Sequence, residues 1–567
     1  MDYKDQILKS LSEVTGIKDI NLETPGNEDY GDYSTNIAML LASKKGETKN
    51  NKSNPTEIAQ GIVQSLSKDK VLQKIVSKIS VEGPGFINFH LSKEALFDNL
   101  SQILERHEKY GHSNLGKKEK VIIEYSSPNI ARRFGIGHLR STIIGQTIFN
   151  LYTTLGFDTV GDNHFGDWGT QFGVIIAAIK RNNLDINNLS VQDLEKLYVE
   201  YNLEAQTDPK LKEDAKKWFK RLEDKDPQAR EIWQKSYDQS LAEFEKIYDL
   251  LEVKIDNGFG ESFYEDKMSG VIAEAREKNI TKKSESAEII EFDDLPPAML
   301  LKSDGATTYF TRDLTTIKYR LDTYHPKKII YEVGVEQTLH FKQVFAAAKK
   351  IGWIKNNEVE LVHVSHGHYR LEGKKMSTRL GRGIKLEEIL RDAVKKAHDL
   401  GSKDEKTAQD VGIGAIKYFD LSHAPETFID FNWDQVMNMQ GNSGPYQQYT
   451  HDRTQSVLAK VKKVEKSKNP TLNQSTLNEN ELTLLRILCR FDDVIISATK
   501  NYSPNLMCNY LNTLSQKYNT FYAKYSILTP SENDQEKRKF RIMLTQGTGQ
   551  ILRNGLTLLG INAPDKM

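Results

Sequence analysis

Two glycines and a histidine at the start of an expected helix form the first group of residues that could do chemistry. Gly135, Gly137 and His138 follow a short apolar run at 121–123 and a polar turn at 126–129. The β-branched run predicts a buried parallel strand, and the apolar spacing after His138 predicts a helix. Backbone N–H groups at a helix N-terminus attract anions, and glycine lets a ligand approach the backbone. The stretch therefore predicts a phosphate site, with an ordinary strand, turn and helix as the alternative.

A phenol and a carboxylate on one helix face could bind a guanidinium group. If the segment TYFTRDLTTIKYR is helical, Tyr309 and Asp313 lie one turn apart on the same face. A planar guanidinium takes a carboxylate as a bidentate acceptor and an aromatic group as a wall. The alternative is an aspartate that only stabilises the first turn of a helix. Gln337 follows a short apolar run at 328–333, and open α/β sheets bind ligands at the carboxyl ends of such strands.

A lysine-rich loop offers positive charge for phosphate chemistry. Residues 373–379 have the sequence GKKMSTR and follow the strand-like stretch LVHVSHGHY. In reactions at phosphorus, negative charge develops on the oxygens of the departing phosphate group. Lys375 and Arg379 could stabilise that charge. A lysine-rich loop by itself is usually only a loop, so its significance depends on the phosphate site that precedes it in the chain.

The composition indicates a globular protein of several domains. The chain has 567 residues, of which 38% are hydrophobic and 28% charged, and this length predicts about three to four domains. Lys+Arg and Asp+Glu are both 78, so global charge gives no argument for nucleic-acid binding. Its two cysteines exclude a disulfide scaffold and a four-cysteine zinc site. Because no signal peptide and no long apolar run are visible, we expect a cytoplasmic protein without membrane contact.

Three domains are expected along the chain. Residues 1–113 show mixed helix and strand patterns, which indicate an α+β module. Residues 114–395 are typical of an α/β domain with a parallel sheet, interrupted at about 184–291 by a charged helical insertion. Residues 396–567 have apolar residues at helical spacing, which predicts an all-α bundle.

Several motifs, in this order along the chain, resemble those of one family. Gly-Ile-Gly-His at 135–138 resembles the HIGH signature of class I aminoacyl-tRNA synthetases, and GKKMSTR resembles their KMSKS loop. The frame SSPNIA…GHLRSTIIG, together with GDWGTQFG, YFTRD and EGPGFINFHLS, resembles the arginyl-tRNA synthetases in particular. The resemblance extends over nearly the whole chain. It implies a Rossmann-type catalytic domain, an N-terminal tRNA-binding domain and a C-terminal anticodon-binding bundle.

The resemblance also implies an activity. Arginine and ATP would form arginyl-adenylate, and a ribose hydroxyl of the terminal adenosine of tRNA(Arg) would then accept the arginine. The implied ligands are ATP with accompanying Mg2+, L-arginine and tRNA(Arg). No residue need act as a covalent nucleophile, so positioning and charge stabilisation would carry the chemistry. We expect a monomer and no metal ion bound by protein side chains.

The resemblance assigns functional roles to the residues of this chain that match the motif positions of the family. The implied catalytic residues are Arg132, His138, Lys375 and Ser377. The implied ATP-binding residues are Gly135, Gly137, His138, Lys375 and Met376. The implied arginine-binding residues are Glu124, Ser127, Asn129, Tyr309, Asp313 and Gln337. The implied tRNA-binding residues are Phe86, Asn88, Tyr446, Tyr449, Tyr518, Tyr522 and Met567, although core packing would use such aromatic residues equally well.

Two departures from the family pattern bear on catalysis. The family has a histidine where this chain has Gly135, and the second lysine of the class-wide loop is replaced by Thr378. Arg132 stands where many arginyl enzymes have a lysine and could compensate for Thr378. Losing one donor to the transition state costs about 3 kcal/mol if nothing replaces it. We therefore expect a working enzyme of reduced rate. The alternatives are a tRNA-binding protein with weakened or lost catalysis and a synthetase for another amino acid.

Overall fold

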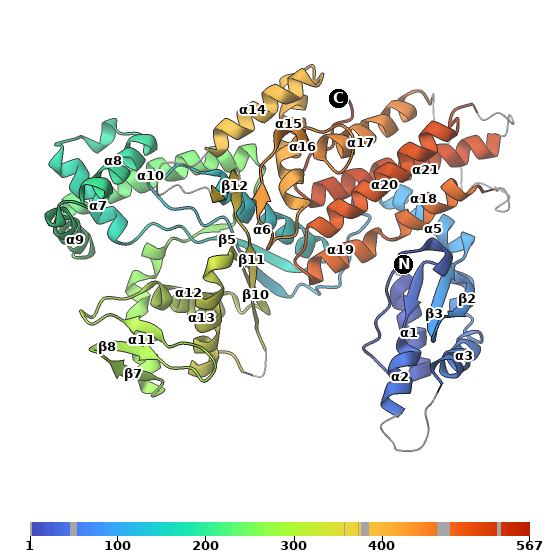
Figure 1. The fold of residues 1–567 in the computed structure, drawn as a ribbon, viewed down its shortest axis with the longest axis horizontal. Helices are drawn as coiled ribbons and strands as arrows, with labels where there is room; N and C mark the ends of the chain where they lie inside the picture. The colour runs from blue at the N-terminus through green and yellow to red at the C-terminus, as the bar shows by residue number, and fades with distance from the viewer. Residues whose placement is uncertain are drawn as a thin grey trace.

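The computed structural model describes residues 3–45, 54–355, 358–371, 374–375, 385–461, 477–529 and 535–567. Figure 1 shows a central sheet with two smaller modules on one side and a helical bundle on the other. The N-terminal module lies against the part of the bundle that is remote from the central sheet.

The N-terminal module is a three-stranded antiparallel sheet packed against helices. The strands are β1 (Tyr33–Thr35), β2 (Val76–Glu82) and β3 (Phe86–Leu91), in the order β1-β3-β2. The helices are α1 (Tyr3–Thr15), α2 (Ile37–Lys45), α3 (Pro55–Leu66) and α4 (Leu72–Ile75), and α5 (Lys93–Arg106) leads out of the module. Ile87 and Phe89 of the central strand are fully buried between these elements. The predicted α+β module is confirmed.

A five-stranded parallel sheet forms the centre of the molecule. Its order is β11-β10-β4-β5-β6, from β4 (Lys120–Glu124), β5 (Asp158–Asn163), β6 (Asn257–Gly258), β10 (Lys328–Gly334) and β11 (Glu360–His366). The apolar run of β4 is buried on both faces, because Ile123 belongs to one hydrophobic core and Ile122 to a second core on the other side.

The helices that connect these strands set the position of the ligand crevice. They include α6 (Ile136–Thr154), α7 (Thr170–Arg181), α12 (Tyr309–Tyr324) and α13 (Thr338–Ile351). From β4 the chain moves to β5 on one side, and later returns to place β10 on the other. The carboxyl ends of β4 and β10 therefore form the switch point at which open α/β sheets bind ligands.

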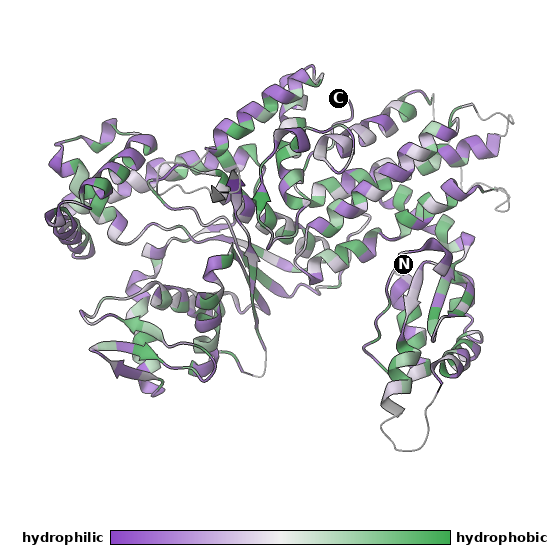
Figure 2. Ribbon diagram, viewed as in Figure 1, coloured by the Kyte–Doolittle hydropathy of each residue, from purple (hydrophilic) through white to green (hydrophobic). Residues whose placement is uncertain are grey.

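The segment predicted as a helical insertion, at about 184–291, is helical only in part. Helices α8 (Val191–Glu204), α9 (Pro209–Glu223) and α10 (Pro227–Leu250) form a module with α7, and Figure 2 shows α9 as mostly hydrophilic. The chain then adds β6 to the central sheet and continues through a 3-10 helix (Glu261–Lys267) and α11 (Met268–Glu277). A small antiparallel sheet follows, formed by β7 (Thr281–Ser284), β8 (Ala287–Ile290) and β9 (Ala298–Leu301). Sequence periodicity could not reveal β6, because two residues show no alternation.

Helices dominate the C-terminal part, which confirms the predicted all-α bundle. They are α14 (Leu386–Asp399), α15 (Glu405–Leu421), α16 (Trp433–Val436), α17 (Gly444–Ala459), α18 (Glu479–Cys489), α19 (Phe491–Lys500), α20 (Asn505–Lys524) and α21 (Gln535–Leu558). Between the central sheet and the bundle lies a small sheet of β12 (Tyr369–Leu371), β13 (Lys374–Lys375) and β14 (Ile429–Asp430).

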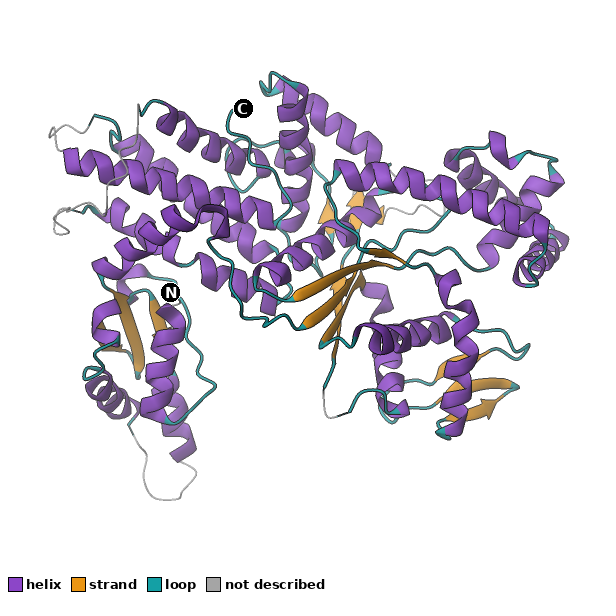
Figure 3. Ribbon diagram, turned by 180° about the vertical axis from the view of Figure 1, so that it is seen from behind, coloured by secondary structure: helices purple, strands orange, loops and turns teal. Residues whose placement is uncertain are grey.

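The N-terminal module is fastened to this bundle. The rings of Phe97 in α5 and Phe540 in α21 are 5.3 Å apart, and the Tyr33 hydroxyl donates to Asp493 at 2.8 Å. Figure 3 shows the module beside the bundle and away from the central sheet. Within the described ranges, no helix has both the length and the apolar character needed to span a membrane.

Candidate active site

The loop after β4 has a strained backbone that α10 holds in place. Ser126, Ser127 and Ala131 have φ values of 75°, 45° and 59°, a conformation that costs a residue other than glycine about 1–3 kcal/mol. The Tyr248 hydroxyl shares a 2.8 Å hydrogen bond with Ser126 Oγ, and Ser240 Oγ accepts one from the Ala131 N–H at 2.9 Å. Such strain persists only where the surroundings enforce it, and it is concentrated at ligand sites.

His138 occupies the first turn of α6 as a neutral ring. Its Nδ1 accepts a hydrogen bond at 3.2 Å from the N–H of Gly135, which is the N-cap of the helix. Burial and the charge of Arg132 lower the pKa of His138 to about 4, so at neutral pH the ring proton is on Nε2 and can be donated. At the exposed Gly137, no atom lies within 4 Å of the position that a Cβ would take. A phosphate group can therefore approach the start of α6.

The two arginines before α6 contact α8. The guanidinium of Arg132 lies 4.6 Å from the ring centroid of Tyr198, whereas Arg133 Nε donates to Glu195 at 2.7 Å. Stacking leaves the in-plane N–H groups of a guanidinium available for an anion. Glu195, in contrast, neutralises Arg133. Of the two, Arg132 is the better placed to contribute charge to a phosphate.

A buried arginine joins the carboxyl ends of β4 and β5. Arg320 of α12 is 0% exposed, and its Nη2 lies 2.5 Å from Glu124 and 2.7 Å from Asp162. Burial disfavours its charge, but the two carboxylates hold the pKa of Arg320 well above its usual range. Burial also raises the pKa of Glu124, and Arg320 opposes that shift. The site thus has one fixed cation for two carboxylates.

Asp313 lies at the same edge of the sheet between two histidines. His340 Nε2 is 2.5 Å and His164 Nε2 is 3.8 Å from its carboxylate oxygens. Burial opposes ionisation, but these partners keep the pKa of Asp313 below its usual range. Asp313 is therefore an anion at neutral pH, as guanidinium binding requires. Tyr309, one turn earlier in α12, is 63% exposed and has its hydroxyl close to Gly169.

The remaining predicted arginine-binding residues lie around this acidic edge. The Ser127 hydroxyl is buried and finds no hydrogen-bond partner within the described part of the chain. Asn129 forms a parallel bridge with Gly166, whose lack of a side chain leaves room for the Asn129 amide. Gln337 is exposed and ends the 3-10 turn that follows β10. The fold therefore places these three residues at the switch point of the sheet.

Glu261 is a site residue that sequence reasoning missed. It follows β6, and its carboxylate is 3.9 Å from the guanidinium of Arg312. Burial raises the pKa of Glu261 to about 7; Arg312 and His164 oppose the rise, and Asp313 adds to it. Because Arg312 directly precedes Asp313 in α12, its contact with Glu261 brings this carboxylate to the same turn of the helix. Its place after a strand end was the available signal, but that strand fell within the predicted helical insertion.

The second signature lies mostly outside the described residues, which include neither Met376 nor Ser377. Only the backbone of Lys375 is described, and it pairs with β12 as part of β13. The described chain resumes at Lys385, which forms an antiparallel bridge with Gly135 at the start of α6. The described chain therefore resumes directly beside the first signature. In the described ranges, no group of three or more His, Cys, Asp or Glu side chains is arranged to hold a metal ion.

Two residues expected to contact tRNA are buried instead. Asn88 is 2% exposed within the N-terminal sheet, and Tyr518 is 0% exposed inside the bundle. Neither side chain can reach RNA from there, so the prediction of direct contact is wrong for both. Phe86, at the start of β3, is 40% exposed.

An exposed aromatic surface remains on the bundle. Tyr449 and Tyr522 are 37% and 40% exposed, and the guanidinium of Arg453 lies 5.0 Å from the centroid of each ring. Tyr446 and Met567 are half-buried. Two ring faces joined by a cation are suited to stacking with unpaired bases.

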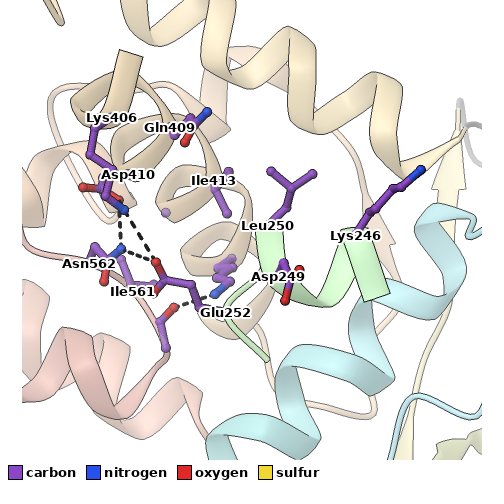
Figure 4. Close-up of a pocket in the computed structure, with 13 residues that line it drawn as sticks. Lys246, Asp249, Leu250, Glu252, Lys406, Gln409, Asp410, Ile413, Ile561 and Asn562 are labelled. Atoms are coloured by element: carbon purple, nitrogen blue, oxygen red, sulfur yellow. Dashed lines mark hydrogen bonds and ion pairs between the residues drawn. The ribbon is translucent and has the colours of Figure 1, made fainter. Parts of the chain in front are cut away.

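A cavity of about 390 Å³ lies apart from these residues, between α10, α15 and the C-terminal tail (Figure 4). Lys417 is 3% exposed and donates to the backbone carbonyls of Leu251 and Gly560. Burial lowers the pKa of Lys417 to about 8. Asn562 donates to Glu252 at 2.9 Å. These bonds tie the end of α10 to the bundle.

Family models match the chain in three consecutive parts. Residues 1–91 match the arginyl tRNA synthetase N-terminal domain, residues 99–433 the catalytic domain of class I tRNA synthetases (R), and residues 447–567 the DALR anticodon binding domain.

Full-length relatives agree with these matches. The arginine–tRNA ligase of Fusobacterium nucleatum is 38% identical over 581 residues, which cover 100% of this chain and 98% of that protein. That of Clostridioides difficile is 36% identical over 588 residues, with 100% of both covered. The crystal structure of arginyl-tRNA synthetase from Plasmodium falciparum has a TM-score of 0.81 at 26% identity, covering 100% of this chain and 99% of that one. The Thermus thermophilus arginyl-tRNA synthetase, with a TM-score of 0.84 at 21% identity and 99% and 100% coverage, shows the same fold.

The catalytic-domain match and the switch-point site define a class I aminoacyl-tRNA synthetase, an enzyme that uses ATP. With identity of this level over its full length, the chain belongs to the arginyl-tRNA synthetase family. The comparisons give no support to the alternative of a tRNA-binding protein without catalysis.

Replacing Arg320 by methionine tests the charge balance of the site. We expect a loss of about 3–5 kcal/mol in the free energy of unfolding of the catalytic domain, because Glu124 and Asp162 would stay buried without a cation. Thermal unfolding of the purified protein measures the effect. The control is Arg276→Met, whose 55% exposed side chain pairs with Glu288 at 2.7 Å, and which should cost no more than about 1 kcal/mol. Equal effects of the two variants would contradict the prediction.

Proposed function

We propose that the chain joins L-arginine to tRNA(Arg) in two steps. A carboxylate oxygen of arginine first attacks the α-phosphorus of ATP, the bond from that phosphorus to the bridging oxygen breaks, and pyrophosphate leaves. A ribose hydroxyl of the terminal adenosine then attacks the carbonyl carbon of the adenylate, and AMP leaves. The observation that carries the proposal is the group of carboxylates formed by Glu124, Asp313 and Glu261, next to the phosphate-accessible start of α6.

The acidic pocket is the site that we assign to the guanidinium of arginine. Asp313 is its main acceptor, since its pKa lies below the usual range and its carboxylate already forms a hydrogen bond with His340. Glu124 is held by Arg320, and Glu261 adds a second acceptor that becomes an anion near neutral pH. The exposed ring of Tyr309 closes one side. A planar guanidinium uses several separated acceptors at once, whereas the ammonium group of lysine does not.

The start of α6 is the site that we assign to ATP. The backbone at Gly135 and Gly137 receives the phosphates, and His138 donates from Nε2 as a neutral group. Arg132 contributes positive charge from the side of α8. The sequence motif assigns further phosphate contacts to Lys375, Met376 and Ser377. Mg2+ arrives with ATP, where phosphate oxygens and water supply most of its ligands.

Contacts to tRNA are assigned to two surfaces that the bundle joins together. Phe86 offers an exposed ring on the N-terminal module. Tyr449, Tyr522 and Arg453 offer two ring faces and a charge on the bundle, with Tyr446 and Met567 in the same domain.

We further propose a monomer that acts in the cytoplasm. One chain contains the acidic pocket, the phosphate site and both assigned tRNA surfaces, so no second copy is needed to complete them. Cys489 and Cys508 are buried and unpaired, which suits a reducing compartment. The domain boundaries at 113/114 and 395/396 stay predictions, because the family matches end at 91 and 433 and resume at 99 and 447.

The Asp313→Asn variant tests the arginine pocket. We expect the KM for arginine to rise about 100-fold, because a neutral amide replaces the anion in a charge-assisted contact. Charging of homologous tRNA with labelled arginine measures the change, and the KM for ATP serves as the internal control. An unchanged KM for arginine would exclude Asp313 from the pocket. No charging by the parent protein would contradict the proposed function itself.

Arginine binding should depend on pH through Glu261. Its pKa of about 7 means that the carboxylate is mostly charged above pH 7 and mostly protonated below it. A cationic ligand binds the charged form better, so the Kd for arginine should rise by up to about tenfold between pH 8 and pH 6. Calorimetry over this range checks the expectation. The dependence should disappear in Glu261→Gln, and its persistence there would assign it to another group.

An exposed and a buried tyrosine of the bundle, Tyr522 and Tyr518, test the assigned tRNA surface. Tyr522→Leu should raise the KM for tRNA about tenfold, because one stacking face is lost. Tyr518→Phe should leave this KM unchanged, since the residue is 0% exposed. Aminoacylation at varied tRNA concentration measures both. Equal effects of the two substitutions would contradict the assigned surface.

A further inference from the structure

We propose that Lys385, which lies opposite Gly135 at the start of α6, supplies positive charge at the α-phosphate of ATP during transfer of the adenylyl group. The proposal rests on the proposed function, which places the phosphates of ATP at this helix terminus. It adds a catalytic residue that lies outside both signature motifs.

The backbone geometry places the two residues side by side. Gly135 and Lys385 form an antiparallel bridge, and the Leu386 N–H donates to the Phe134 carbonyl at 3.1 Å. This bond joins the residue after Lys385 to the residue before Gly135, which is the pattern around a pair that is not mutually hydrogen-bonded. In such a pair the Cα atoms are only about 4.5 Å apart. The side chains of directly opposite residues also lie on the same face. Gly135, directly opposite Lys385, has no side chain of its own on this face.

The surroundings favour an anion at this point. Gly135 is the N-cap of α6 and Lys385 is the N-cap of α14, and neither helix has a side-chain cap on its first N–H groups. Two helix termini of positive polarity therefore begin at one bridged pair. Within the described part of the chain, the Lys385 ammonium forms an ion pair with Glu388, at 3.2 Å on the same helix.

Exchange of that partner for a phosphate costs little. The side chains of Lys385 and Glu388 are 34% and 46% exposed, and such surface pairs contribute about 0–1 kcal/mol. Phosphate oxygens offer a higher charge than one carboxylate. The ammonium group can thus leave Glu388 when ATP binds.

The chemistry needs such a cation. As the bond between the α-phosphorus and the bridging oxygen breaks, that oxygen leaves with the pyrophosphate and takes the electron pair. His138 is neutral and donates a single hydrogen bond, so it adds no charge. The role assigned to Lys385 is electrostatic and involves no proton transfer.

Arginine-dependent ATP–pyrophosphate exchange in the presence of tRNA tests the proposal. We expect Lys385→Met to lower kcat about 100-fold, with the KM for arginine unchanged within about twofold. Lys385→Arg keeps the charge and should retain most of the activity. The control is Lys395→Met, the same substitution at an exposed position of α14, which should match the parent. A loss of less than about tenfold in Lys385→Met would overturn the proposal.

The Gly135→His substitution distinguishes a catalytic role of Lys385 from a purely structural one. The quantity compared is the change in kcat that the histidine causes with and without Lys385. Gly135 has a φ of −94°, which any residue can adopt, so Gly135→His is compatible with the backbone. We expect Gly135→His to raise kcat at least about tenfold in the Lys385→Met background and less than about threefold in the parent. Equal gains in both backgrounds would mean that the two positions act independently and would overturn the proposal.

Folding and the proposed function are checked separately. Circular dichroism and the thermal midpoint show whether Lys385→Met is folded; if it is not, Lys385→Gln takes its place with the same criterion. An inactive parent would contradict the proposed function. An active parent, with variants of unchanged rate, would contradict only the role of Lys385.

Discussion

The buried guanidinium of Arg320 is the constraint on which the active site depends. It pairs with both Glu124 and Asp162, so two neighbouring strands can carry buried carboxylates at their carboxyl ends. Asp313, whose pKa lies below its usual range, and Glu261, whose pKa is about 7, add negative charge to this edge at neutral pH. The pocket therefore attracts a cationic ligand while each carboxylate keeps a fixed position. Arg320 also shows that this edge of the sheet has the geometry to surround a guanidinium.

The active site also depends on helix α10, which contacts the strained loop after β4. Ser240 and Tyr248 hold the strained loop after β4, so the helix that stabilises the site belongs to the module between α7 and β6. The end of the same helix is tied to the bundle by Lys417 and Asn562. Helix α10 therefore holds the loop from outside the sheet. The same helix links the strained loop of the catalytic domain to the C-terminal bundle. Removing the helical module would release the contacts that hold the strained loop.

Sequence reasoning succeeded where the geometry is local. The strand at Val121–Ile123 and the helix after His138 follow from apolar spacing, and the Tyr309 and Asp313 pair follows from the rise of a helix turn. It failed where burial depends on distant partners. Asn88 and Tyr518 match family motifs, yet neighbouring elements cover both side chains. Glu261 was missed because a two-residue strand has no periodic signal.

The sequence by itself determined which ligand groups the protein can bind. A helix N-terminus suits a phosphate, and a carboxylate with a phenol suits a guanidinium. These features need only residues within one or two turns of each other, so local rules are sufficient to identify them. Only the tertiary structure decided which charges meet. Arg320 reaches Glu124 and Asp162, and Lys385 comes to lie opposite Gly135, through contacts between segments about 150 to 250 residues apart. Such pairings depend on the order of strands and the packing of helices, which no local pattern encodes.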